Sequence, residues 1–128
     1  MSTSDGISTE DWNAVHELVL SIANAEAEAE ENIFTNQLLQ ALDELEGRYG
    51  ALPSILATRA DYVSDVSEQA VLFRQAYALA ESSNDIRNLK LISHSLAELY
   101  IRELKDPLEG RVWLKRLEAQ IQFSPDED

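Results

Sequence analysis

The residues best suited to chemistry stand together at His94-Ser95, with Glu98 one helical turn further along the chain. A serine, a histidine and a carboxylate are the groups that form a nucleophile, a base and its orienting acid. Neighbouring positions of a helix point about 100° apart, however, so His94 and Ser95 diverge. We therefore interpret His94 as an ordinary surface or groove histidine and predict that the protein is not an enzyme.

The sequence contains no motif typical of a metal-binding or cofactor-binding site. His16-Glu17 lacks a second histidine four residues further on, which a zinc-binding helix needs. The four glycines form no phosphate-binding loop, and the chain has no cysteine to provide a thiolate ligand. We expect no metal and no cofactor.

The strongest signal in the composition is charge. The 128 residues carry a net charge of −14, and eleven acidic residues precede the first basic residue, Arg48. The remaining chain has 13 acidic and 10 basic residues. Such a distribution repels nucleic acid and anionic lipid and attracts a basic partner, although an acidic face can also serve only solubility.

The hydrophobic pattern and the N-terminal sequence predict where in the cell the protein is located. No apolar run approaches the ~18 residues of a membrane span, and the acidic N-terminus lacks the features of a signal peptide. We expect a cytoplasmic protein that binds neither nucleic acid nor membrane; its oligomeric state is left open.

The hydrophobic spacing predicts an all-α fold of about six antiparallel helices joined by short loops. The first helix is expected from Thr9 to about Ala29, and the second to end at Gly47 or Gly50. The others are expected at 53–63 and 66–82, and after the caps Asp85 and Asp106. The predicted organisation is a single domain, 1–128, with a disordered N-terminus (1–8), an acidic helical hairpin (9–50), two further hairpins (53–122) and an acidic tail (124–128).

The two C-terminal hairpins form a weak repeat. Asp65 and Asp106 begin helices 41 positions apart, whereas Ala57 and Ala97 are 40 apart. In its spacing and small residues, SLAELYIRELKD…EGRVWLKRL resembles a tetratricopeptide repeat, which implies a short α-solenoid or bundle. Two features depart from that pattern: one extra residue before Asp106, and Gln69 where a small residue is usual.

Two surfaces are candidate binding sites, against the alternative that both are merely solvated. The first is a polar face expected along the first helix, which comprises Glu10, Asp11, Asn13, Glu17, Asn24, Glu28 and Glu31. The second is a groove between hairpins, which comprises Ser54, Thr58, Asp61, Lys90, His94 and Glu98.

A second resemblance concerns the whole chain. DWNAVHELVLSIANA, LDELEGRYGALPSILATRADY and SLAELYIRELKDPLEGRVWL are similar to stretches of small acidic immunity proteins of bacterial polymorphic (Rhs-type) toxin systems. The resemblance implies a cytoplasmic inhibitor that binds one cognate toxin domain and blocks its active site. A toxin that acts on nucleic acid or nucleotides tends to have a basic cleft, and we expect the polar face of the first helix to occupy it. The alternative is a tetratricopeptide-like adaptor or chaperone that holds a peptide in its groove.

Overall fold

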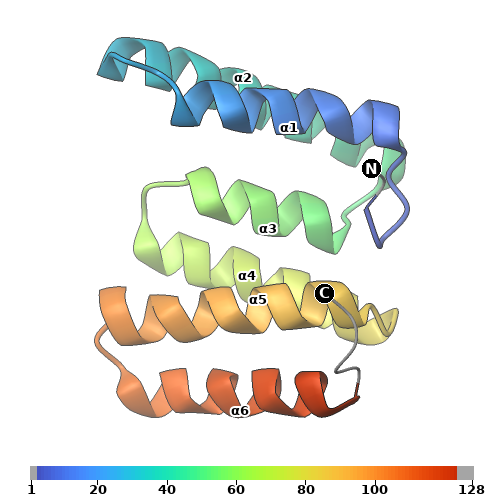
Figure 1. Cartoon of the computed structure of the whole chain (residues 1–128), viewed down its shortest axis with the longest axis vertical. Coiled ribbons are helices and arrows are strands. Elements are labelled where there is room, and N and C mark those ends of the chain that lie inside the picture. The colour runs from blue at the N-terminus through green and yellow to red at the C-terminus, as the bar shows by residue number, and fades with distance from the viewer. Residues whose placement is uncertain (1–2, 124–128) are drawn as a thin grey trace. The chain divides into compact units, whose positions relative to one another are not determined.

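The computed structural model describes residues 3–123 and confirms the all-α fold. This part of the chain forms six α-helices and one π-helix and contains no strand (Figure 1). The helices fall into two compact units, residues 1–51 and residues 52–128. None of the described helices is long and apolar enough to cross a membrane.

Unit 1 is a helical hairpin of α1 (Thr9–Ala23) and α2 (Glu28–Tyr49), which pack against each other in antiparallel directions (Figure 1). The Ser8 hydroxyl accepts the Asp11 N–H at 3.2 Å and so caps α1, as its position before the apolar stripe predicts. The buried side chains recur at helical spacing on each helix, and they are Val15 and Ile22 of α1 and Leu38, Leu42 and Leu45 of α2.

The end of α1 corrects one prediction. The first helix was expected to continue to about Ala29, but it ends at Ala23, and Asn24 caps its C-terminus. The alternating Ala and Glu that follow are good helix formers, so local preference favours continuation. They offer no wide apolar face, however, and the chain turns so that the leucines of α2 can be buried. Tertiary packing therefore overrides local preference.

Two further corrections concern the limits of unit 1. Gly47 lies inside α2, which ends at Tyr49 and is capped by Gly50, where φ is +87°. The N-terminal segment was expected to be disordered, but its described part is folded: the Ile7 N–H donates to the Thr3 hydroxyl at 2.9 Å and the Ile7 side chain is fully buried. Residues 1–2 and the acidic tail 124–128 lie outside the described residues.

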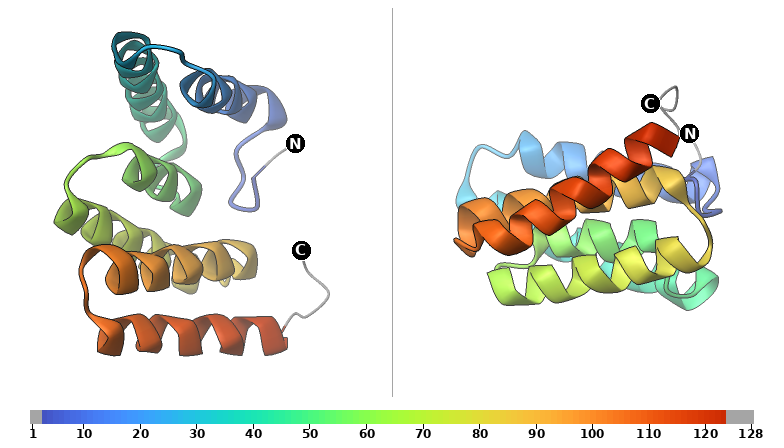
Figure 2. Two further views of the ribbon diagram at one scale, coloured as in Figure 1. Left: turned by 60° about the vertical axis from the view of Figure 1, so that its left-hand side comes forward. Right: turned by 90° about the horizontal axis from the view of Figure 1, so that it is seen from below.

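Unit 2 consists of α3 (Pro53–Tyr62), α4 (Val66–Ser82), α5 (Ile86–Glu98) and α6 (Pro107–Phe123). Each helix packs mainly against its neighbours in the chain, and Figure 2 shows the four following one another in a stack. The aspartates that precede α4, α5 and α6 accept backbone N–H groups of the first turns, as predicted, and they are Asp65, Asp85 and Asp106.

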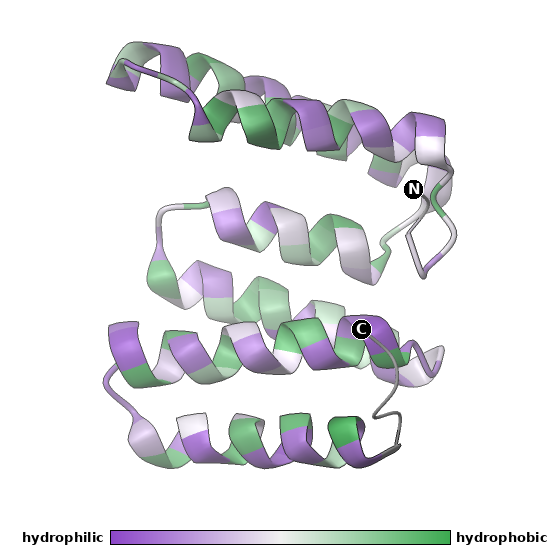
Figure 3. Cartoon of the chain, in the orientation of Figure 1, coloured by the Kyte–Doolittle hydropathy of each residue, from purple (hydrophilic) through white to green (hydrophobic). Residues whose placement is uncertain are grey.

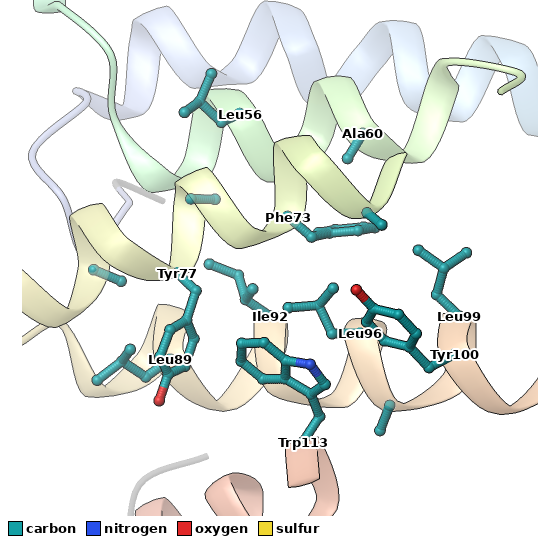
Figure 4. Close-up of a cluster of buried hydrophobic side chains, with 14 residues drawn as sticks. Leu56, Ala60, Phe73, Tyr77, Leu89, Ile92, Leu96, Leu99, Tyr100 and Trp113 are labelled. Atoms are coloured by element: carbon teal, nitrogen blue, oxygen red, sulfur yellow. The ribbon is translucent and has the colours of Figure 1, made fainter. Parts of the chain in front are cut away.

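The core of unit 2 is shared by all four α-helices and by the segment that follows α5, and it includes Leu56 and Ala60 of α3. Figure 4 shows Phe73 and Tyr77 of α4 directed toward Leu96 of α5 and Trp113 of α6. The Tyr77 and Trp113 rings meet edge to face with centroids 4.9 Å apart, and only 4% of Trp113 is exposed. Such a pair adds a directional contact to the burial of two large rings.

A π-helix, η1 (Leu99–Glu103), continues α5 without a break. The Leu104 N–H donates to the Leu99 carbonyl at 3.0 Å, five residues back instead of the usual four. A π-turn therefore encloses one more residue than an α-turn. It absorbs the extra residue before Asp106 and explains why the repeat spacing changes from 40 to 41.

Candidate functional site

The acidic surface of unit 1 is built on two helices. Glu10, Asn13 and Glu17 lie on one exposed face of α1, and Asn24 caps that helix. Glu28 and Glu31 are also exposed, but they belong to the first turn of α2 because α1 ends early. The seven predicted residues therefore do not form one stripe on a single helix. Figure 3 shows hydrophilic residues along both helices.

Asp11 differs from the other predicted acidic residues because its charge is already engaged. Its carboxylate accepts a hydrogen bond from the Tyr49 hydroxyl and two from the Arg48 guanidinium, at 3.0 and 3.2 Å. These donors, Tyr49 first and then Arg48, hold the pKa of Asp11 below its usual value. Asp11 thus joins the start of α1 to the end of α2.

The acidic residues at the start of α2 also have a structural reason to be there. Carboxylates near a helix N-terminus stabilise the helix dipole, and the Glu30 carboxylate accepts the Glu26 N–H at 3.3 Å. Even so, unit 1 contains eleven acidic residues and one basic residue, Arg48, which is paired with Asp11. The unit is strongly negative.

Unit 2 contains an open groove of about 450 Å³. Its walls come from the end of α3, the loop to α4, the first turns of α4, the end of α5 and η1. The lining residues are Asp61, Val63, Ser64, Val66, Gln69, Phe73, Ser95, Glu98, Leu99, Arg102 and Glu103.

The groove contains only part of the set predicted from the sequence. Asp61 and Glu98 line it, whereas Ser54, Thr58, Lys90 and His94 are not among its lining residues. The His94 Nδ1 lies 3.5 Å from a carboxylate oxygen of Glu98. The Ser54 hydroxyl accepts a long hydrogen bond of 3.4 Å from Asn88, which the Asp85 carboxylate also holds.

Asp61 has the most perturbed acidity in the groove. The residue is exposed, but neighbouring atoms remove part of the hydration of its carboxyl group, and this desolvation raises the pKa of Asp61 to about 6. Burial, together with the nearby Asp61 charge, also raises the pKa of Tyr62. At neutral pH, Asp61 is therefore a carboxylate that a cation would stabilise.

Gln69, Arg102 and Glu103 are among the polar residues of the groove that sequence reasoning missed. The Gln69 side-chain amide donates to the Ala60 carbonyl at 2.9 Å, a carbonyl of the last turn of α3, which has no helical partner. The signals that could have found them were the two departures from the repeat, Gln69 itself and the extra residue near Arg102 and Glu103.

Within residues 3–123, no group of three or more histidine, aspartate or glutamate side chains could hold a metal ion. The chain matches no protein-family model, no curated protein and no solved structure. The conclusions about function therefore rest on its own charge and geometry.

Proposed function

We propose that this protein is a cytoplasmic immunity protein that acts by binding, not by catalysis, and blocks a toxin domain with a basic cleft. One observation carries the proposal: unit 1 has eleven acidic residues and one basic residue, and Asp11 pairs with that base. An unbalanced charge of this size, at a distance of about one Debye length or less, accelerates the encounter with a basic surface.

The exposed face of α1 is the strongest candidate for the contact. Leu20 is 48% exposed, and helical spacing puts it on the same face as Asn13 and Glu17. Interfaces commonly combine an apolar centre with a polar rim, so Leu20 can be buried by the partner while Glu10 and Glu17 meet its basic groups. Asp11 is excluded from this role because Arg48 and Tyr49 already occupy its carboxylate.

The test begins with the full chain used to capture proteins from its native host, washed at low and then at high salt. The proposal expects one basic domain that arrests growth when it is expressed alone and is neutralised when this protein is co-expressed. No captured protein with that behaviour would contradict the proposal.

Charge reversal then locates the interface. Glu10→Lys with Glu17→Lys should abolish neutralisation, while Glu28→Lys with Glu31→Lys makes the same charge change on α2 as the matched control. Equal loss in both pairs would indicate that total charge, and not the α1 face, provides the affinity.

A second candidate function, a peptide-binding adaptor, is favoured by the groove of unit 2. Its volume of about 450 Å³ is within the usual range of about 300 to 1,000 Å³ for ligand sites. This function predicts that Asp61→Asn with Glu98→Gln reduces partner binding while the α1 charge reversals do not. The opposite result would support the immunity function.

A further inference from the structure

The two places where unit 2 departs from a regular repeat lie in the same groove. Gln69 stands 41 positions before Gly110, so a long polar side chain in one hairpin corresponds to a glycine in the next, and η1 adds one residue after α5. Gln69 lines one wall of the groove, and Leu99, Arg102 and Glu103 of η1 line another. π-Turns are rare and occur frequently at functional sites. Their coincidence with a cavity makes this groove a candidate binding site.

The groove has an apolar part. Phe73 of α4 and Leu99 of η1 are both almost completely buried and yet contribute to its lining. Val63 and Val66 add apolar surface beside them. A ligand that presents a hydrocarbon segment as well as a polar group would complement this mixed lining.

The polar part of the groove is negative. Asp61, Glu98 and Glu103 line it together with one basic residue, Arg102. The Arg102 Nε lies 3.8 Å from a Glu98 carboxylate oxygen, and both side chains are at least half exposed. If Arg102 pairs with Glu98, the carboxylates of Asp61 and Glu103 have no basic residue of the groove to neutralise them. A cationic ligand would complement these two charges.

We propose that the groove binds one arginine side chain of a protein partner. The alkyl stem would lie against Phe73 and Leu99, and the guanidinium would meet Asp61 and Glu103. Arginine fits this combination because its long stem covers apolar surface while its planar head donates to more than one carboxylate. The inference deepens the second candidate function and rests on it; it is independent of the acidic surface of unit 1.

The acidity of Asp61 makes the binding sensitive to pH. Protonation of its carboxyl near pH 6 removes one of the charges that attract the guanidinium. Tyr62 adjoins it on α3, and the other charged residues that line the groove are Glu98 on α5 and Arg102 and Glu103 on η1. The affinity should therefore fall as the pH is lowered through about 6.

The test uses the full chain and two blocked tripeptides, acetyl-Ala-Arg-Leu-amide and the same peptide with citrulline, which has the shape of arginine without its charge. Amide chemical shifts are followed by NMR during titration at pH 7.5 and pH 5. The arginine peptide should bind with a dissociation constant on the order of 1 mM and shift the amides of Ser64, Gln69, Ser95, Leu99 and Arg102.

Variants decide whether the carboxylates are responsible. Asp61→Asn and Glu103→Gln should each weaken binding of the arginine peptide about tenfold, and Asp61→Asn should also remove the difference between pH 7.5 and pH 5. Glu81→Gln changes an exposed carboxylate of α4 outside the groove and should leave binding unchanged.

Three outcomes would overturn the inference, and they differ in what they say of the adaptor function. Equal binding of the citrulline peptide would retain a peptide groove but refute the choice of a cation. Binding of neither peptide at about 10 mM would refute both. Chemical-shift changes confined to unit 1 would show that the arginine binds the acidic hairpin instead.

Discussion

The contact between Gly110 and η1 provides the sharpest test of the structure. Gly110 is buried in the first turn of α6, and a Cβ atom at this position would lie 2.5 Å from Cγ1 and 3.1 Å from Cδ1 of Ile101. A carbon–carbon distance below 3.0 Å requires a shift of one of the two groups. Gly110→Ala should therefore destabilise unit 2, although alanine normally favours a helix.

The size of the effect follows from two opposing contributions. Overpacking of a core position costs about 1–3 kcal/mol, while replacing glycine by alanine in a helix gains up to about 1 kcal/mol. Ile101 is 42% exposed and can move in part, which puts the cost in the lower half of its range. We expect Gly110→Ala to lower the free energy of unfolding by about 1 kcal/mol.

Gly47 is the matched control because it is also a helical glycine, but no atom lies within 4 Å of the position its Cβ would take. Gly47→Ala should raise the free energy of unfolding of unit 1 by about 0.5–1 kcal/mol. The same chemical change is thus predicted to have opposite signs in the two units.

The two tryptophans allow each unit to be followed separately, because Trp12 belongs to unit 1 and Trp113 to unit 2. Urea unfolding of Gly110→Ala in a Trp12→Phe background reports on unit 2 through the fluorescence of Trp113. Gly47→Ala in a Trp113→Phe background reports on unit 1. A shift of the midpoint without a change of slope measures stability alone.

A double-mutant cycle tests the cause. Truncation of the neighbour by Ile101→Ala removes the atoms that a new Cβ would meet, so Gly110→Ala should then be neutral or stabilising. If Gly110→Ala is equally destabilising with and without the Ile101 side chain, the reasoning from this contact is refuted.

Three further predictions concern Trp113 and two carboxyl groups. Trp113→Ala should cost about 3–5 kcal/mol of unfolding free energy, measured by circular dichroism in urea, because it empties a buried site, and a loss below about 1 kcal/mol would contradict the packing. The pKa of Asp61 rises on folding from 3.8 to about 6, so the free energy of unfolding of the wild type should fall as pH rises from 4 to 6. Asp61→Asn should remove this pH dependence of stability. A variant with the same pH profile as the wild type would refute the raised pKa. The effect of Asp11 on stability has the opposite sign, because folding lowers its pKa below 3.8. Its contribution to the free energy of unfolding is present above about pH 4 and is lost as pH falls further. Asp11→Asn should therefore flatten the stability profile only below about pH 4.

Features that depend on a few neighbouring residues could be predicted from the sequence alone. Asp65, Asp85 and Asp106 cap their helices because a carboxylate two or three residues ahead of free N–H groups needs no distant partner. Helical spacing likewise identified buried positions such as Leu42 and Leu96. The concentration of negative charge before Arg48 is a property of the sequence itself.

Other features depended on contacts between distant residues, and only the tertiary structure decided them. The break after Ala23 contradicts local helix preference, since burial of α2 determines it. Asp61 and Glu98 share a groove although 37 positions separate them, and His94 and Thr58 do not join them there. The extra residue before Asp106 was visible in the repeat spacing. Whether it would lengthen the loop or form a π-turn was not, because the packing of α6 on α5 decides this.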